Sequence, residues 1–347
     1  MTTACERKAR NEERLQPFLL NPYEIAVCGR RGASLTRIVT RIKQEAPAGF
    51  ELAWITNHTG NQEWLRDEFG PPRLLGADAV VVEDGTDVKN VPKLVLANAD
   101  PRVAFSHVIA YLDSGRVSTK SADIPRFSTR KAGRVFSFVW EHFQARAKKT
   151  PLYGLILAGG MSTRMKRDKS LLNYYGKPQT LYCLDLLAPV CERVYVSCRA
   201  DQATQHRRLN VPQIHDRFLG FGPMGGILSA LKTHPNAAWL VLGCDLPFVD
   251  EATIETLIAG RNPFKYATAF LSARDELPEP LCSIYEPKSV FKLLEHVALG
   301  HHCPRKALTN SRVESLTAVN PRALTNVNHP REYEEAVTLL AKTKKAR

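Results

Sequence analysis

The sequence predicts an α/β protein of two domains, each with a mostly parallel sheet and flanking helices. Short apolar runs, typical of buried parallel strands, recur along the 347 residues, and several end at glycine or aspartate before a helical pattern. This length is comfortable for two domains. We expect a charged leader at 1–21, a first domain at 22–112, a basic linker at 113–150 with a short helix over Val135–Phe143, and a second domain at 151–347.

The first domain opens with an expected strand, Tyr23–Cys28, that runs into the segment GRRGASLT at 29–36. A phosphate-binding loop would occupy this position. However, the G-x-x-x-x-G-K-[ST] pattern has a glycine where this chain has Ser34 and a lysine where it has Leu35. Without that lysine, the β- and γ-phosphates lose their main counter-ion, which leaves only the two arginines of the loop as substitutes. We therefore expect no nucleotide hydrolysis here.

Further strands of the first domain are expected at 55–59, 76–85 and 92–97. The order of a loop of P-loop type, a histidine-bearing strand, the GADAVVVEDG strand at 76–85 and the PKLVLA strand at 92–97 resembles the MobB type of GTP-binding adaptor over about residues 22–112. This resemblance implies a P-loop-like fold with a degenerate loop, in which the fold is retained more than the activity.

The second domain contains the segment LILAGGMSTRMKRDKS at 155–170, an apolar run that breaks at two glycines and then turns basic. Paired glycines let backbone N–H groups approach a phosphate or base closely, and ligands of open α/β sheets bind beyond strand carboxyl ends. A glycine turn with a solvated basic loop is the alternative. The hydroxyl of Ser162 and the two spaced cations Arg164 and Lys169 favour a nucleotide site.

The pattern L-A-G-G-x-S-x-R-M-x-x-D-K in this segment is similar to the signature of the molybdenum cofactor guanylyltransferases of the MobA type. The resemblance covers residues 152 to about 341, and includes PEPL at 278–281 and NVNHP at 326–330. It implies a Rossmann-like nucleotidyltransferase fold that transfers GMP from GTP to the phosphate of molybdopterin cofactor, with release of pyrophosphate and Mg²⁺ as cofactor.

The rest of the second domain alternates strand and helix. We expect a helix at Leu181–Leu187, a strand at Val194–Ser197, an apolar helix from Ile227 and a strand at Ala238–Cys244. Asp216 follows the short segment 212–215 and precedes a glycine-rich loop at 220–226.

Two aspartates at strand ends are candidate site residues. An isolated carboxylate at Asp245 is costly to desolvate, whereas a divalent cation between it and a triphosphate satisfies both charges. Capping of the following helix is the alternative for Asp245. Asp216 can accept hydrogen bonds from N1–H and the exocyclic amine of guanine, and a turn-forming role is its alternative.

The resemblance also assigns roles to the other candidate residues. Leu157, Ala158, Gly159 and Gly160 would bind the nucleotide together with Lys169, Asp216 and Asp245. Arg164 would contact the β- and γ-phosphates, Lys169 the α-phosphate, and Asp245 the Mg²⁺. Arg305, Asn326 and Asn328 are candidates for the second substrate. Surface charge is the alternative for Arg305, and helix capping for Asn328.

The sequence departs from the family pattern at two places. Lys166 stands where the family usually has glycine, and Cys198-Arg199-Ala200 replaces an expected asparagine. Base selectivity is therefore open, and a pterin cytidylyltransferase or a sugar-nucleotide pyrophosphorylase are alternatives. The degenerate first domain also leaves a non-catalytic molybdenum cofactor carrier or assembly adaptor open.

The composition limits the classes of molecule that the protein is expected to bind. The formal net charge is +13, yet no nucleic-acid motif and no membrane-length apolar run occur in the sequence, so we expect phosphorylated ligands. The MobA resemblance implies that these ligands are GTP and molybdopterin. Molybdenum-insertion proteins or a molybdoenzyme chaperone are the expected protein partners. Eight scattered cysteines without a C-x-x-C pair fit a reducing cytoplasm, and we interpret His301-His302-Cys303 as a loop rather than a metal site.

Overall fold

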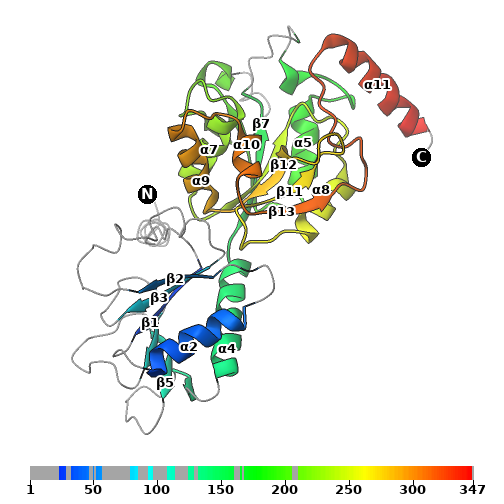
Figure 1. The fold of residues 1–347 in the computed structure, drawn as a ribbon. Helices are drawn as coiled ribbons and strands as arrows, with labels where there is room; N and C mark the ends of the chain where they lie inside the picture. Colours follow the sequence, from blue (N-terminus) through cyan, green and yellow to red (C-terminus); the bar gives the residue numbers. More distant parts are fainter. Residues whose placement is uncertain are drawn as a thin grey trace, which may run out of the picture. The chain divides into compact units, whose positions relative to one another are not determined.

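A computed structural model describes residues 23–28, 33–46, 50, 52–56, 79–84, 93–96, 108–113, 124–128, 132–159, 165, 168–204 and 210–345. Contacts between Cα atoms divide the chain into two units, Met1–Arg146 and Ala147–Arg347. Each unit has its own sheet with helices beside it (Figure 1). The predicted fold class, α/β with mostly parallel sheets, is confirmed.

The first unit contains a six-stranded sheet in the order β2-β3-β1-β4-β5-β6. Each neighbouring pair is parallel, and the strands are β1 (Glu24–Cys28), β2 (Leu52–Thr56), β3 (Ala79–Asp84), β4 (Lys93–Leu96), β5 (Val108–Asp113) and β6 (Arg126–Ser128). The four residues of β4 are all buried, as the apolar run at 92–97 predicts.

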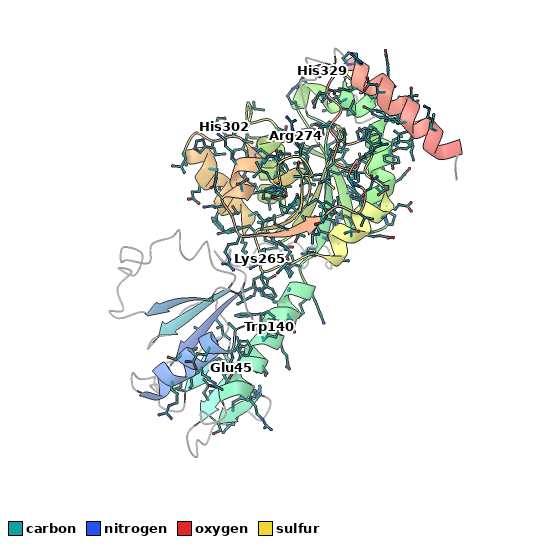
Figure 2. The ribbon with its side chains drawn as sticks, turned by 45° about the vertical axis from the view of Figure 1, so that its right-hand side comes forward. Glu45, Trp140, Lys265, Arg274, His302 and His329 are labelled. Carbon is teal, nitrogen blue, oxygen red and sulfur yellow. The ribbon has the colours of Figure 1, made fainter. Side chains whose placement is uncertain are left out.

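Two helices of the first unit are described, α2 (Ala33–Gln44) and α4 (Ala132–Lys148). Val135, Val139 and Phe143 of α4 are buried because four-residue spacing places them on one face of the helix. Trp140, labelled on the same helix in Figure 2, packs edge-on against Phe50. The centroids of the two rings are 5.2 Å apart.

The segment 113–150 differs from the basic linker with a short helix that the sequence predicts. Residues 126–128 form a strand that pairs with β5, and the helix spans 17 residues instead of nine. The expected leader at 1–21 and the loop residues 29–32 lie outside the described residues, as do the side chains of Ser34 and Leu35. The MobB resemblance of this half stays a prediction.

The second unit contains a seven-stranded sheet in the order β13-β11-β12-β10-β7-β8-β9. The strands are β7 (Leu152–Leu157), β8 (Arg193–Cys198), β9 (Gln213–His215), β10 (Ala238–Gly243), β11 (Ala267–Leu271), β12 (Pro278–Tyr285) and β13 (Val313–Thr317). β12 runs antiparallel to β10 and β11, and the other pairs are parallel.

Helices cover both faces of this sheet. On one face are α5 (Gln179–Leu187) and α8 (Glu251–Ala259), and on the other are α7 (Pro223–Thr233), α9 (Ser289–Ala298) and α10 (Pro304–Thr309). The last helix, α11 (Pro330–Lys345), packs instead against Met165, Leu172 and Tyr174. The 3₁₀ turns are η2 (Lys169–Leu171) and η3 (Ala200–Gln202). The predicted helix at Ile227 begins earlier, at Pro223, because proline is well suited to the first helical position.

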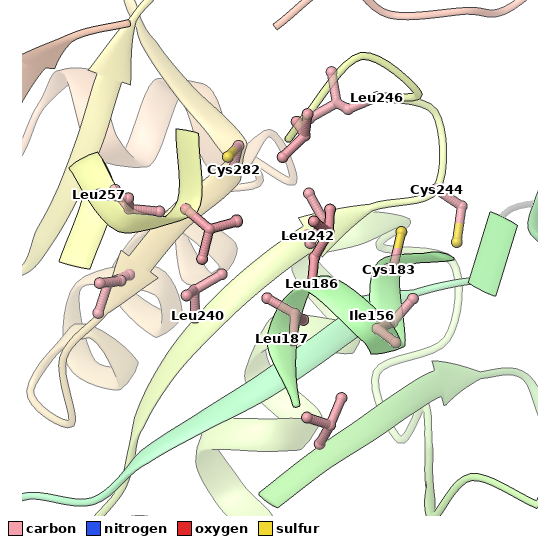
Figure 3. Close-up of a cluster of buried hydrophobic side chains, with 14 of the residues drawn as sticks. Ile156, Cys183, Leu186, Leu187, Leu240, Leu242, Cys244, Leu246, Leu257 and Cys282 are labelled. Atoms are coloured by element: carbon pink, nitrogen blue, oxygen red, sulfur yellow. The ribbon is translucent and has the colours of Figure 1, made fainter. Parts of the chain in front are cut away.

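Alternation along β10 separates two hydrophobic cores. Leu240 and Leu242 pack into a core with residues of α5 and α8 (Figure 3), whereas Trp239 and Val241 pack into a second core with residues of α7, α9 and α10. Buried apolar layers on both faces explain why β10 reads as a continuous apolar run in the sequence.

The topology brings three strand ends together. β7 pairs with β8 on one side and β10 on the other, all parallel, so their carboxyl ends lie at the same edge of the sheet. Ala158, the first residue after β7, continues the pairing with β8, because its N–H donates to the carbonyl of Ser197 at 2.9 Å. Segments that follow these strands therefore meet at the edge where ligands of open α/β sheets bind.

Candidate active site

A cavity of about 560 Å³ lies at this edge of the second sheet. Of the residues that the sequence singles out, the lining includes Leu157, Ala158, Gly159, Lys169, Asp216, Asp245 and Asn328. The predicted residues Gly160 and Arg164, together with Ser162 and Lys166, lie outside the described residues.

Gly159 lies close to the carboxylate of Asp216. A Cβ atom at this position would lie 2.9 Å from Oδ2 of Asp216 and 3.5 Å from the Cα atom of Cys198. The first of these separations is shorter than real Cβ atoms show. The absence of a side chain thus lets the loop after β7 approach the carboxylate of Asp216.

Lys169 is positioned by the residues that flank it. Asp168 is the N-cap residue of η2. Its Oδ1 accepts hydrogen bonds from the backbone N–H (3.0 Å) and from the hydroxyl (2.6 Å) of Ser170. The amide of Gln202 donates to Oδ2 of Asp168 at 3.1 Å. The half-buried Lys169 side chain extends to the cavity wall, where Nζ donates to Oδ1 of Asn328 at 2.6 Å.

Asp245 follows β10 and contributes its carboxylate to the cavity. Burial raises the pKa of this carboxyl, and the nearby Lys169 ammonium opposes that shift. Helix capping, the alternative from the sequence, is wrong: α8 begins at Glu251, and Asp250 caps it by accepting from the N–H of Thr253 at 3.0 Å.

The donor set around Asp245 fits a magnesium ion that also binds phosphate. Within the described ranges, no group of three or more His, Cys, Asp or Glu side chains gathers as a metal cage. Mg²⁺ is commonly held by one or two carboxylates plus substrate phosphates and waters, so a single carboxylate beside a nucleotide cavity is sufficient. His301, His302 and Cys303 are exposed, as expected of a loop.

Asp216 directly follows β9, and its carboxylate lies against Ser197 of β8 and against Gly159, which follows β7. The hydroxyl of Ser197, a buried residue, donates to Oδ1 of Asp216 at 2.6 Å. Burial raises the pKa of Asp216, while the Ser197 hydrogen bond and the charge of Arg199 act in the opposite direction. The carboxylate therefore has one oxygen fixed by protein and the other directed toward the glycine loop.

The three candidates for the second substrate lie in different surroundings. Asn328 lines the cavity, and its side-chain oxygen accepts from Nζ of Lys169 rather than from an N–H group of α11. Oε2 of Glu332 accepts instead from the backbone N–H groups of Asn328 (2.6 Å) and His329 (3.1 Å). Asn326 is exposed and does not line this cavity. Of the three candidates, only Asn328 lines the cavity.

Arg305 is engaged with two carboxylates away from the cavity lining. Its guanidinium donates to Glu279 at 2.6 Å and to Asp275 at 3.1 Å, and Glu279 is only 2% exposed. Burial raises the pKa of Glu279, and the charge of Arg305 opposes this shift. The surface-charge alternative is therefore wrong, and in this structure the arginine neutralises a buried carboxylate.

Some lining residues were not singled out from the sequence as site residues. Arg199 donates from Nη1 to the carbonyl of Gly159 at 3.1 Å and lines the cavity. Phe218 and Leu219 line the cavity at the start of the glycine-rich loop, and Leu219 is 71% exposed. The replacement of asparagine at Cys198-Arg199 was the sequence signal for Arg199, whereas no motif marks the loop side chains.

Cys183, Cys191, Cys198, Cys244, Cys282 and Cys303 are free thiols, and Cys28, Cys183, Cys198, Cys244 and Cys282 are buried. None of the described helices is long and apolar enough to cross a membrane.

Comparisons with known proteins find relatives of part of this chain, mainly within the second unit. The family model described as a MobA-like NTP transferase domain matches residues 154–316. A molybdenum cofactor guanylyltransferase of Pseudomonas putida is 31% identical over 191 residues, which cover 54% of this chain and 98% of that protein. A molybdenum cofactor biosynthesis bifunctional protein of Synechocystis is 38% identical over 190 residues, 55% of each chain, so the match spans about half of that relative.

Solved structures are similar to the same portion of the chain. Molybdopterin-guanine dinucleotide biosynthesis protein A of Archaeoglobus fulgidus is 22% identical, with a TM-score of 0.48, over 55% of this chain and 99% of that chain. A nucleotidyl transferase of Methanothermobacter thermautotrophicus is 16% identical, with a TM-score of 0.47, over 56% of this chain and 99% of that chain.

Proposed function

This chain belongs to the family of MobA-like nucleotidyltransferases of molybdenum cofactor biosynthesis, and we propose that it transfers GMP from GTP to the terminal phosphate of molybdopterin cofactor. The products are the guanine dinucleotide cofactor and pyrophosphate. Membership of an enzyme family argues against the non-catalytic carrier or adaptor as the role of the second unit.

One observation carries this proposal. The glycine loop after β7, the ammonium of Lys169 and the carboxylates of Asp216 and Asp245 all line one cavity at the carboxyl ends of parallel strands. A nucleoside triphosphate requires close backbone approach, positive charge for its phosphates, a carboxylate for a metal and hydrogen-bonding groups for its base. Each of these elements is present in the cavity.

The chemistry of the transfer needs positioning more than proton transfer. The acceptor phosphate oxygen attacks the α-phosphorus of GTP in line, the new P–O bond forms, and the bond to pyrophosphate breaks. Because the nucleophile is already an anion, no protein base is required, and catalysis comes from orientation and charge stabilisation. Lys169, held by Asn328, is placed to stabilise charge that develops on the α-phosphate.

Asp245 is the residue that would hold a magnesium ion in this cavity, and the ion would neutralise charge on the phosphates as pyrophosphate leaves. The backbone N–H groups at Ala158 to Gly160 would hold the nucleotide. Arg164 is the proposed partner of the β- and γ-phosphates, from its place in the signature. Molybdopterin cofactor is the proposed second substrate, and proteins that insert molybdenum cofactor are the proposed macromolecular partners, in the cytoplasm.

Pyrophosphate release tests the proposal directly. The full chain is incubated with GTP, ATP, CTP or UTP and Mg²⁺, with and without molybdopterin cofactor. We expect release with GTP that depends on the acceptor, and formation of the guanine dinucleotide cofactor by mass spectrometry. Preference for CTP would replace the proposal by the pterin cytidylyltransferase, and a sugar phosphate as the better acceptor would replace it by a pyrophosphorylase.

A further inference from the structure

We propose that Arg199 is a specificity-determining residue that donates to O6 of guanine, beside Asp216, which accepts from the N1–H and N2 amine. This inference rests on the proposed function, because it concerns how the same cavity selects GTP. It goes further by assigning the base edge to a pair of side chains, one of which departs from the family pattern.

Arg199 is held in a fixed orientation at the cavity wall. Nε and Nη2 donate to the two carboxylate oxygens of Asp201 at 2.9 and 2.7 Å, a bidentate pair, and Nη1 donates to the carbonyl of Gly159 at 3.1 Å. The arginine side chain is 29% exposed, whereas that of Asp201 is 66% exposed. Asp201 therefore holds the guanidinium from the solvent side while Arg199 itself lines the cavity.

The guanidinium retains donors for a ligand. An arginine has five N–H groups in a rigid plane, and the described residues accept three of them. The remaining two belong to Nη1 and Nη2. Because the plane is fixed at both Asp201 and Gly159, a ligand that meets these donors need not order a flexible side chain.

Asp216 supplies the complementary acceptors next to this donor. Oδ1 accepts from Ser197, and Oδ2 lies beside Gly159, whose carbonyl is bonded to Arg199. The charges of Arg199 and Asp216 are close enough for the arginine to oppose the rise that burial causes in the pKa of Asp216. The cavity wall therefore presents a donor and a pair of carboxylate acceptors around one glycine.

This pattern matches one edge of one base. Guanine presents O6 as an acceptor next to N1–H and the N2 amine as donors, so a donor beside two acceptors complements it, as cytosine does in a base pair. Adenine presents an amine donor and a ring-nitrogen acceptor at the corresponding positions. Arg199 would then face a donor and Asp216 an acceptor, which leaves buried groups unpaired and disfavours ATP.

Replacing Arg199 would have different effects on nucleotide binding if the residue only holds the loop at Gly159 than if it donates to O6 of guanine. If Arg199 only held the loop at Gly159, its loss would weaken every nucleotide to the same extent. If it donates to O6, its loss would weaken GTP but scarcely affect an analogue in which O6 is replaced by a poor acceptor. The ratio between two nucleotides is therefore the informative quantity.

The experiment compares GTP with 6-thio-GTP, in which sulfur replaces O6, and with ITP, which lacks the N2 amine. Equilibrium binding by calorimetry without acceptor, and pyrophosphate release with molybdopterin cofactor, are measured for the full-length wild type and for Arg199→Met. In the wild type we expect GTP to be preferred over 6-thio-GTP by about 10-fold, since an unpaired buried donor costs about that factor. In Arg199→Met this preference should fall to about 1, while the preference over ITP remains.

Two further variants keep the test decisive. Asp201→Asn retains the arginine but loosens its bidentate pair, and should reduce the GTP to 6-thio-GTP ratio partially. Arg217→Gln removes the same charge from an exposed neighbour of Asp216 and should leave the ratio at its wild-type value. An unchanged ratio in folded Arg199→Met would overturn this inference while the guanylyltransferase proposal stands. A wild type that prefers CTP would instead overturn the proposed function.

Discussion

The ammonium of Lys169 donates a 2.6 Å hydrogen bond to the amide oxygen of Asn328, 159 residues further along the chain. The adjacent residue, Val327, donates its N–H to the carbonyl of Asp245 at 2.8 Å. One short segment before α11 thus contacts both the lysine of the glycine-loop motif and the proposed metal ligand. These contacts link the two groups that are proposed to act on the same triphosphate.

Lys169→Met should reduce the rate of GMP transfer by about 10²–10³-fold, because one oriented electrostatic contact to a developing charge is worth about that much. The variant should fold, since the lysine side chain is only half-buried. Single-turnover pyrophosphate release, with circular dichroism as a check of folding, measures the effect. Turnover close to the wild-type rate in a folded variant would remove Lys169 from the mechanism.

Asn328→Ala should lower the transfer rate by about 10-fold, because it removes a hydrogen bond to the charged ammonium and leaves Lys169 less well oriented. Since Asn328 acts through Lys169, the double variant Lys169→Met/Asn328→Ala should be no slower than Lys169→Met alone. Additive losses in this double-mutant cycle would show instead that Asn328 contacts a substrate independently.

Asp245→Asn should abolish most of the dependence of the rate on Mg²⁺, since the amide lacks the negative charge that a hard cation prefers. The measurement is the transfer rate as Mg²⁺ is titrated, together with its removal by a chelator. Asp250→Asn is the control, because that aspartate caps α8 and does not line the cavity. A wild-type Mg²⁺ titration curve for Asp245→Asn would contradict the assignment.

Arg305→Met should destabilise the second unit by about 2 kcal/mol, because it leaves the buried carboxylate of Glu279 without its cation. The Michaelis constant for molybdopterin cofactor should change little, since Arg305 pairs with Glu279 and Asp275 rather than lining the cavity. Denaturant unfolding and acceptor titration separate the two effects. Arg274→Met, at an exposed neighbour, is the control and should shift stability by less than about 0.5 kcal/mol. A large rise in the Michaelis constant with unchanged stability would restore the second-substrate role.

The loop at 29–36 should not hydrolyse GTP, because Leu35 occupies the position of the phosphate-binding lysine. The full chain carrying Lys169→Met, in which transfer is suppressed, is incubated with GTP and Mg²⁺, and inorganic phosphate is measured. Steady phosphate release that disappears when Thr36→Ala is added would show an active first domain.

Local patterns were sufficient to predict the central parallel strands β7, β8 and β10 of the second sheet, but not β11, β12 and β13. Continuous apolar runs end at Leu157 and Gly243, and the residues that follow them, Gly159 and Asp245, line the cavity as the parallel topology requires. Burial on both faces produces a signal in consecutive residues, so a single sequence contains it.

Contacts between residues that are distant in the sequence could not be predicted. Arg305 was assigned to a phosphate, because nothing local shows that it meets a buried Glu279, 26 residues away. In the sequence, Arg199 was noted only as a departure from the family pattern. Its place at the cavity depends on a hydrogen bond to the carbonyl of Gly159, which lies 40 residues earlier in the chain. The segment 113–150 was interpreted as a linker because its charge is high, although α4 buries Val135, Val139 and Phe143 along one face.

The contacts of Val327 and Asn328 also determine when the enzyme is completed during its synthesis. The ribosome produces β7, β10 and the residues Lys169 and Asp245 well before position 327 is translated, so a nascent chain has the glycine loop and both charged groups but lacks the segment that joins them. A messenger RNA truncated between codons 246 and 327 would therefore yield a protein with the nucleotide-binding motifs and without the partner of its lysine.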